Sequence, residues 1–492
     1  MSPNNPASVT AAFTEGQQFR GAELFKSQRL TDGPKETTSR HTLFEAVGAA
    51  MAKLESDIAD GPIVPSVTPR EIRDHLTSHY DFSKPRTLND LGADIERMLQ
   101  TWQVHVTHPR YFGLFNPSVT LPSVIADLLV AMYNPQLASW RSSPAANEME
   151  RHVLAWLSSK FGLPRNTAAT FTSGGAEANL SAVVVALTRR FPNYADEGVR
   201  GLPATPTIYL TADAHHSFHK IAHITGLGRN ALRTVTTDCN LKMDLAGLER
   251  QVAEDRRNGL APLMVVGTAG TTAAGVIDPL PDVARFCRSQ DLWFHADAAW
   301  GGAAIVSPEL KGYLAGIEAA DSITCDAHKW FSVPVGAGMF FCRHRESVGE
   351  AFRAKAPYMP VPADETTDPY TTSVQWSRRF IGLKLFLALA QRGESGYVEM
   401  IEHQARMGRL LRESLRLSGW RVVNATPLPL VCFTRDRLDT SKIVAALQER
   451  QIAWMSEVQL RGVPVVRACI TSFRTTENDI ACVVREMNQL VS

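Results

Sequence analysis

Short apolar runs alternate with amphipathic stretches through the middle of the chain. Seven runs rich in Val, Ile, Thr, Leu and Phe predict β-strands, at residues 169–172, 207–210, 232–235, 263–266, 292–294, 322–325 and 338–342. Between most of these runs, apolar residues recur at helical spacing, over residues 176–189, 217–226, 245–253 and 280–287. Strands that alternate with helices predict an α/β fold with a mostly parallel, seven-stranded sheet and helices on both faces.

The region before the predicted sheet has another pattern. Residues 1–40 are poor in apolar side chains, so we expect a flexible lead-in. Helical spacing follows over residues 43–54, 71–79 and 91–104, and again over 121–132 and 148–161. We expect an N-terminal helical segment over residues 1–104 and a large domain over residues 105–376.

The C-terminal part mixes strands and helices. A Pro-, Asp- and Thr-rich stretch over residues 359–372, which we expect to be a mobile loop, precedes predicted helices over 377–389 and 399–417. Strands predicted over 420–423, 430–433 and 465–470 then alternate with helices predicted over 441–449 and 477–490. This order predicts a small α+β C-terminal domain over residues 377–492.

Composition and charge exclude several classes of protein. The 492 residues are 44% hydrophobic and 21% charged, as in ordinary globular proteins, and the formal net charge is +1, which favours neither nucleic acid nor an anionic membrane. The chain has no apolar run of membrane-spanning length, and residues 1–20 lack the apolar core of a secretory signal. The seven cysteines include no Cys-x-x-Cys pair, so we expect reduced thiols, no metal site and a cytoplasmic protein.

An acid and a lysine follow two of the predicted strands. Asp297 comes after the strand at 292–294, and Lys329 comes after the strand at 322–325. Ligands of α/β proteins bind at the carboxyl ends of strands, and pyridoxal phosphate enzymes need a lysine for the Schiff base and an acid for the pyridinium nitrogen. Taken singly, each residue has an ordinary alternative, a solvated surface lysine or a turn-capping aspartate.

A glycine turn offers a place for a phosphate. Residues 172–179, Thr-Ser-Gly-Gly-Ala-Glu-Ala-Asn, join a strand to a helix, and glycines there let a ligand approach the free N–H groups of the helix start. The turn has neither the P-loop spacing nor the dinucleotide fingerprint. Its alternative is a turn in which the glycines serve geometry alone.

Two further strand ends carry candidate cofactor contacts. Residues 212–217, Ala-Asp-Ala-His-His-Ser, hold two adjacent histidines, and either ring could stack on an aromatic cofactor or serve as an ordinary loop residue. Residues 267–272, Gly-Thr-Ala-Gly-Thr-Thr, form a turn with three hydroxyls, for which ordinary turn chemistry is the alternative.

Together these segments resemble the group II pyridoxal-phosphate-dependent amino acid decarboxylases, a family that includes glutamate, aromatic amino acid and diaminobutyrate decarboxylases. The resemblance covers roughly residues 105–480 and keeps the order of the motifs throughout. The motifs that carry it are the glycine turn above, His108-Pro109-Arg110-Tyr111-Phe112, Ser143-Pro144-Ala145, Asp297-Ala298-Ala299-Trp300 and His328-Lys329-Trp330. The family has the type I fold of pyridoxal phosphate enzymes, resembling aspartate aminotransferase, and is homodimeric with sites at the subunit interface.

The resemblance implies a role for each matching residue. Lys329 would hold the cofactor covalently, and Asp297 would face the pyridinium nitrogen. His215 would stack on the ring and Ala299 would pack on its other side. The remaining cofactor contacts that the resemblance implies are Gly175, Ala176, Thr268 and His328.

Two departures from the family pattern are visible. Ala176 stands where several relatives carry Ser, so one side-chain contact to phosphate is missing if the role is shared. Asp326-Ala327 replaces the Asn-Pro that precedes His-Lys in animal aromatic decarboxylases, which disfavours that subgroup.

A tyrosine of the 359–372 loop is the candidate acid for protonating Cα. The family places a loop tyrosine ahead of the segment that is Arg378-Arg379-Phe380 here, which favours Tyr370, with Tyr358 as the competitor. The alternative for Tyr370 is a solvent-exposed loop aromatic.

We expect decarboxylation of an L-amino acid to its amine and CO2. The alternatives are an aldehyde-forming or aminotransferase-type enzyme on the same fold, or a non-enzymatic relative. Candidate pocket residues, each of which could equally belong to the core, are Phe112, Leu114, Phe115 and Trp140. Arg110 and Arg141 could recognise an acidic side chain or form surface salt bridges. Leu114 replaces an aromatic residue of aromatic decarboxylases and weakly favours a non-aromatic substrate.

Overall fold

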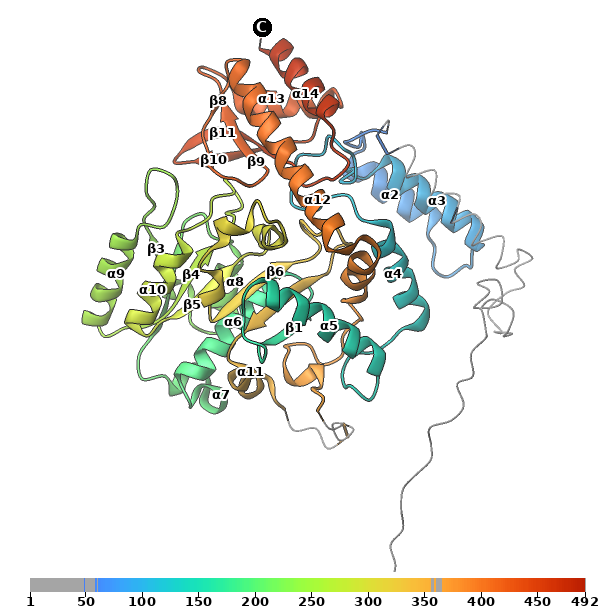
Figure 1. Ribbon diagram of the computed structural model, residues 1–492. Helices are drawn as coiled ribbons and strands as arrows, with labels where there is room; N and C mark the ends of the chain where they lie inside the picture. The colour runs from blue at the N-terminus through green and yellow to red at the C-terminus, as the bar shows by residue number, and fades with distance from the viewer. Residues whose placement is uncertain (1–47, 49–57, 60, 355–357, 360–364, 492) are drawn as a thin grey trace, which may run out of the picture.

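The computed structural model describes residues 48, 58–59, 61–354, 358–359 and 365–491 (Figure 1). The lead-in over residues 1–40 lies outside the described residues, and so does the helix predicted over 43–54 apart from Gly48. Within the described ranges, no helix combines the length and the apolar character that a membrane crossing requires. All seven cysteines are described, and none of them is bonded to another.

A seven-stranded sheet forms the centre of the molecule, in the order β1-β7-β6-β5-β4-β2-β3. Its strands are β1 (Ala168–Thr172), β2 (Pro206–Thr211), β3 (Leu232–Val235), β4 (Ala261–Thr268), β5 (Trp293–Asp297), β6 (Ser322–Asp326) and β7 (Gly338–Cys342). The strands β6, β5, β4, β2 and β3 pair in parallel, whereas β7 runs antiparallel to both neighbours, β1 and β6. The predicted mostly parallel sheet is confirmed.

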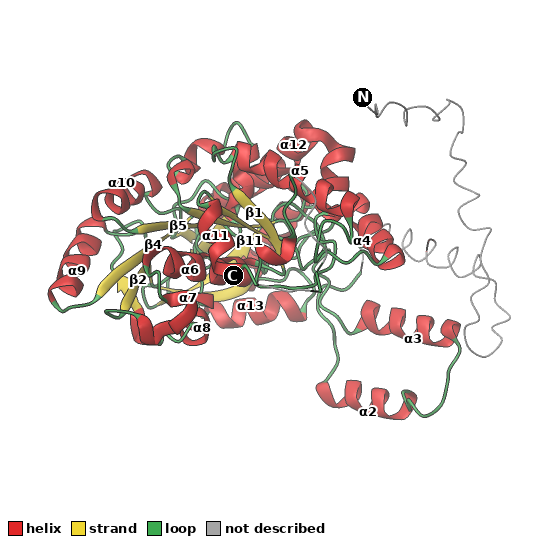
Figure 2. Cartoon of the chain, turned by 90° about the horizontal axis from the view of Figure 1, so that it is seen from below, coloured by secondary structure: helices red, strands yellow, loops and turns green. Residues whose placement is uncertain are grey.

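Helices cover both faces of this sheet (Figure 2). Successive side chains of a strand point to opposite faces, so Met339 and Phe341 of β7 join one apolar cluster while Phe340 and Cys342 join the other. One face packs against α6 (Gly175–Arg190), α8 (Ser217–Ile224) and α11 (Arg345–Phe352). The other packs against α5 (Pro144–Lys160), α9 (Leu245–Arg257), α10 (Leu280–Gln290) and the start of α12 (Leu383–Leu417).

A second, antiparallel sheet lies in the C-terminal part, in the order β10-β11-β9-β8. Its elements are β8 (Arg421–Val422), β9 (Leu430–Thr434), β10 (Ser456–Leu460), β11 (Val463–Cys469), α13 (Thr440–Glu449) and α14 (Glu477–Leu490). The sequence pattern missed β10, because only Leu460 of this strand is buried and the strand exists through its pairing with β11. Arg461 and Gly462, with φ of 53° and 73°, turn the chain between the two strands.

The long element α12 agrees with one prediction and corrects another. It consists of two helices that meet at a kink at Gly393, whose φ is 67°, as the helices predicted over 377–389 and 399–417 require, but the first begins at Leu383 rather than at 377. The preceding residues are held by Glu150 of α5, which accepts hydrogen bonds from the Arg378 guanidinium at 2.9 and 2.6 Å and from the Gly382 N–H at 2.9 Å. These contacts keep residues 378–382 out of a helix.

The N-terminal helices are α2 (Pro69–His79), α3 (Leu88–Thr101) and α4 (Leu121–Tyr133). A capping box between Thr68 and Glu71 starts α2, none of whose residues is buried. We propose domain boundaries near residues 104 and 376, supported by the two separate sheets and by the kinked helix α12 that packs against both.

The buried pair of Arg378 and Glu150 should be important for stability. Both side chains are almost fully buried, with 3% and 4% exposed, so Arg378→Ala leaves a buried carboxylate without its partner. We expect a loss of about 3–5 kcal/mol of unfolding free energy, measured by urea denaturation. The control is the exposed pair of Arg151 and Glu148 on α5, the helix that also carries Glu150. Arg151→Ala should lower the unfolding free energy by less than about 1 kcal/mol. Equal losses in the two variants would contradict this assignment.

Candidate active site

Three polar side chains meet at the carboxyl ends of neighbouring parallel strands. β4 ends at Thr268, β5 at Asp297 and β6 at Asp326, and Thr268 pairs with Asp297 in the register of β4 and β5. Lys329 follows in the turn after β6, where the charge of Asp297 acts on its amine. The structure therefore brings together the two residues that the sequence singled out first.

The amine of Lys329 is largely buried and ion-paired. Its Nζ lies 3.0 Å from Asp326 Oδ2, and it sits over the ring of Phe115, 5.8 Å from the centroid. Burial alone lowers the pKa of Lys329, but the carboxylates of Asp326 and Asp297 outweigh burial, and the pKa is raised. The free amine is thus held as an ammonium group, which must lose a proton before it can act as a nucleophile.

Asp297 is fixed by two donors. This residue is only 4% exposed; its Oδ2 accepts a hydrogen bond from Asn179 Nδ2 at 3.0 Å, and its Oδ1 accepts one from the Ala299 N–H at 3.2 Å. An ionised carboxylate accepts hydrogen bonds only, so both partners suit the charged form.

His215 lies in the same site, and the structure favours it over His216 as the stacking residue. The charges of Asp297 and Lys329 act on His215, whereas the ring of His216 lies beside that of His219. The Ser217 N–H donates to His215 Nδ1 at 3.2 Å, so the proton of the neutral ring is on Nε2. His215 is exposed at the strand end, leaving its ring accessible to a flat ligand.

The glycine turn before α6 leaves room where a phosphate is expected. No side chain caps the N-terminus of α6, so its first N–H groups are available to an anion. A Cβ added at Gly175 would meet Asp326 Oδ2 at 2.9 Å and the Ala299 Cβ at 3.2 Å. A Cβ at Gly174 would meet the His328 ring at 3.5 Å, which places His328 against this turn. At Gly175 the backbone can approach Asp326 this closely only because the side chain is absent.

The donor set fits pyridoxal phosphate. Four features meet at one end of the sheet: the amine of Lys329, the carboxylate of Asp297, the uncapped start of α6 and the ring of His328. The Thr268 hydroxyl is buried without a hydrogen-bond partner and so remains available to a ligand. Ala176, the second residue of α6, contributes its backbone but no hydroxyl.

A model of the family described as the pyridoxal-dependent decarboxylase conserved domain matches residues 69–436, about three quarters of the chain. The protein belongs to this family. It is accordingly an amino acid decarboxylase whose cofactor is pyridoxal phosphate, as the sequence motifs predicted.

Curated relatives and a solved structure are similar to this chain over most of its length. The L-2,4-diaminobutyrate decarboxylase of Acinetobacter baumannii is 31% identical over 359 residues, 69% of this chain and 70% of the relative. The 4-hydroxyphenylacetaldehyde synthase of Rhodiola rosea is 26% identical over 471 residues, 92% and 94% of the two chains. The crystal structure of Oryza sativa TDC with PLP and tryptamine has a TM-score of 0.86 at 23% identity, covering 94% of this chain and all of that one. The type I fold is thereby confirmed.

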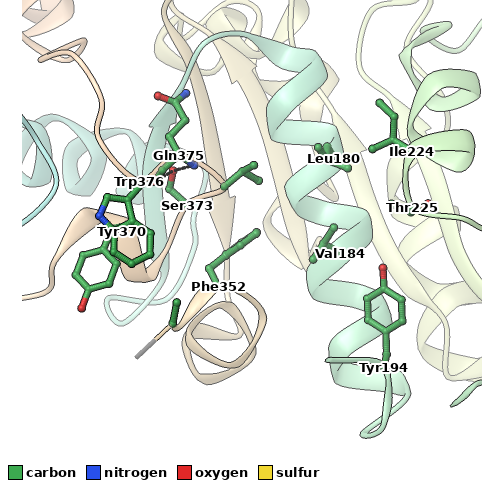
Figure 3. Close-up of a pocket in the computed structure, with 12 residues that line it drawn as sticks. Leu180, Val184, Tyr194, Ile224, Thr225, Phe352, Tyr370, Ser373, Gln375 and Trp376 are labelled. Atoms are coloured by element: carbon green, nitrogen blue, oxygen red, sulfur yellow. Dashed lines mark hydrogen bonds between the residues drawn. The ribbon is translucent and has the colours of Figure 1, made fainter. Parts of the chain in front are cut away.

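The candidate acid Tyr370 lines a cavity that the cluster around Lys329 does not border. Tyr370 packs on Trp376, with ring centroids 4.8 Å apart, and lines a cavity of about 420 Å³ opposite Leu180 and Val184 of α6 (Figure 3). The lining of this cavity includes neither Lys329 nor Asp297. The competitor Tyr358 is 76% exposed, and its ring centroid lies 6.1 Å from that of Trp376.

The candidate substrate residues have different environments in the structure. Phe112 is fully buried in the C-terminal core, and Trp140 donates its indole N–H to Glu148 at 2.9 Å. Leu114 is 54% exposed, and Arg110 faces Asp479 of α14 at 4.0 Å. Of these candidates, Phe115 is the one whose ring lies beneath the Lys329 amine. The same ring also packs on Trp300 at a centroid distance of 4.5 Å.

Sequence reasoning missed Arg467, a buried cation near the same ring. Arg467 of β11 is 2% exposed, and its guanidinium lies 4.8 Å from the Phe115 centroid. It donates to the backbone oxygens of Thr272 and Gly113 at 2.9 and 2.8 Å, while Nη2 has no partner and no carboxylate of the described residues pairs with it. Its one sequence signal was a charge inside the apolar run Val463–Cys469.

The ion pair of Lys329 and Asp326 predicts how cofactor uptake depends on pH. Because Asp326 contributes to the raised pKa of Lys329, Asp326→Asn should increase the neutral amine fraction near pH 7 and shift the pH profile of uptake to lower pH. We expect several-fold faster binding of pyridoxal phosphate to the Asp326→Asn apoenzyme, measured by stopped-flow absorbance across pH 6–9. An unchanged profile would show that Asp326 does not control the proton on this amine.

Proposed function

We propose that the protein converts an L-amino acid into the corresponding amine and CO2, with Lys329 and Asp297 as its central catalytic residues. The observation that carries this proposal is the convergence of both side chains in one buried site at the ends of β5 and β6. Pyridoxal phosphate, when bound, supplies an electron-accepting ring for the electron pair left behind by CO2.

The residues of the site have separate tasks. Lys329 would hold the cofactor covalently through its amine, in exchange with the amine of the substrate. Asp297 keeps the ring nitrogen protonated, which makes the ring a better electron acceptor. The other cofactor contacts are His215 and Ala299 against the ring, Thr268 through its free hydroxyl, and Gly175, Ala176 and His328 around the phosphate.

Arg467 binds a carboxylate of the substrate. A buried guanidinium with an unpartnered Nη2 is costly unless a ligand completes its hydrogen bonds, and Phe115 connects it to Lys329. Every L-amino acid carries an α-carboxylate, so this role requires no acidic side chain in the substrate.

Tyr370 donates the proton that replaces CO2 at Cα. Because the cavity that it lines does not border Lys329 of its own chain, we place it in the site of a second copy, in a homodimer with active sites at the subunit interface. An apolar stripe on α4 supports self-association, since Leu121, Ile125, Leu128 and Met132 recur at helical spacing and are each 43–50% exposed. Because one relative is named as an aldehyde synthase, the test must distinguish an amine product, in which Cα is protonated, from an aldehyde product.

Product analysis tests the proposed reaction and the role of Tyr370. Incubation with the common L-amino acids should release CO2 and an amine from one substrate class, with the amine identified by mass spectrometry. Tyr370→Phe should lose amine formation and divert product to the aldehyde and ammonia in the presence of oxygen, whereas Tyr358→Phe should leave the amine as product. Amine release by Tyr370→Phe at an unchanged rate would exclude this residue as the donor.

A mixing experiment tests where Tyr370 acts. Lys329→Ala and Tyr370→Phe should each fail to form amine, but exchanging subunits between them should restore it, because a hybrid dimer has one site with both residues. Mixtures that stay inactive after confirmed subunit exchange would contradict a shared site.

Arg467→Met should weaken substrate use without preventing cofactor binding. Loss of a charged hydrogen bond is worth about 1.5–3 kcal/mol, so kcat/KM should fall roughly 10–150-fold, mainly through KM. The control is Arg412→Met, which removes another largely buried arginine, one that donates to the Leu430 carbonyl and faces no part of the site. If both variants change only thermal stability, Arg467 has a structural role.

A further inference from the structure

Asp297 is one end of a line of buried hydrogen bonds that runs through α6, β5 and β6. Asn179 of α6 donates from Nδ2 to Asp297 Oδ2 at 3.0 Å, and its Oδ1 lies 3.1 Å from His295 Nε2. His295 Nδ1 lies 2.8 Å from Ser322 Oγ, which also accepts the indole N–H of Trp293 at 2.8 Å. Trp293, His295 and Asp297 alternate along β5, so all three side chains face α6.

The chemistry of the two ends fixes the direction of every bond. An indole N–H can only donate, so Ser322 accepts from Trp293 and still has its own proton and one lone pair to offer His295 Nδ1. At the other end an ionised carboxylate can only accept, so the amide nitrogen of Asn179 faces Asp297 and the amide oxygen faces His295. His295 must then carry its proton on Nε2, which leaves Nδ1 to accept the proton of Ser322.

The side chains of Asn179 and His295 within this line have hydrogen-bond partners and carry no charge. The second hydrogen of Asn179 Nδ2 points to Ser217 Oγ at 3.4 Å, so the amide makes contacts through both donor positions and its acceptor. Asn179 is 1% exposed and His295 is fully buried, and burial lowers the pKa of His295 to about 4. His295 therefore stays neutral near pH 7 and keeps one tautomer.

We propose that Asn179, oriented by His295, is a positioning residue that holds the Asp297 carboxylate in one orientation toward the ring nitrogen of the bound cofactor. This inference rests on the role proposed above for Asp297. Without the line behind it, the amide could rotate and present its oxygen to the carboxylate, which would repel the negative charge instead of stabilising it. His295 disfavours that rotation because its Nε2–H donates to the amide oxygen at 3.1 Å, a shorter contact than the 3.5 Å to the Thr324 hydroxyl.

A purely structural role would make a different prediction. Breaking the line would then reduce stability, as removal of any satisfied buried amide does, and would leave the protonation of the cofactor ring unchanged. Asn424 provides the matched control: it is 6% exposed, donates to two backbone carbonyls and accepts one backbone N–H, all at 2.8–2.9 Å, in the C-terminal part of the chain.

The test uses holoenzyme loaded with pyridoxal phosphate labelled with 15N in the ring, whose chemical shift reports whether the nitrogen is protonated. Asn179→Leu and His295→Leu should move the shift toward that of unprotonated pyridine, and kcat should fall about 10–100-fold, the range typical when a partner that orients a functional group is lost. His295→Gln, whose amide nitrogen can replace Nε2–H, should keep the shift near that of the unmodified holoenzyme. Asn424→Ala should lose thermal stability without changing the shift.

Two results would overturn the inference, and they are distinguishable. If Asp297→Ala moves the ring shift but Asn179→Leu does not, the positioning role is wrong while the function proposed for Asp297 stands. If Asp297→Ala itself leaves the shift unchanged, the role of Asp297 is wrong and the inference falls with it.

Discussion

The buried ammonium group of Lys329 is the feature on which the rest of the site depends. An amine at this depth is unfavourable unless negative charge accompanies it, and Asp326 at 3.0 Å together with Asp297 provides that charge. The fold brings these groups together because β5 and β6 are adjacent and parallel, so their last residues lie at the same edge of the sheet. The same edge receives the uncapped start of α6, which completes a site for a phosphorylated aromatic aldehyde.

The site also joins the two sheets of the molecule. Arg467 belongs to the C-terminal sheet, yet its guanidinium donates to the carbonyl of Thr272, which follows β4 of the central sheet, and to that of Gly113. Both this guanidinium and the Lys329 amine lie over the ring of Phe115, so the cofactor end and the proposed substrate end share one aromatic ring. Packing of the two sheets is therefore part of the active site and not only of the fold.

The sequence predicted those features whose signal is local. The strand β7 and the helix α14 were predicted at the observed residues, because each has a clear apolar pattern between clear boundaries. Asp297 and Lys329 were found because a polar residue directly after a buried strand is a local signal. The start of α12 was placed six residues too early, since the contact of Arg378 with Glu150, 228 positions away, decides it. Asn179 and Arg467 were missed for the same reason: their roles arise from partners far away in the sequence.

The central claim is that Lys329 holds the cofactor covalently. The most direct measurement is reduction of the holoenzyme with borohydride, followed by digestion and mass-spectrometric mapping of the pyridoxyl label. We predict one labelled peptide with the label on Lys329, and no label after prior removal of the cofactor. A label on another lysine, or none on a holoenzyme that retains its cofactor, would contradict this account.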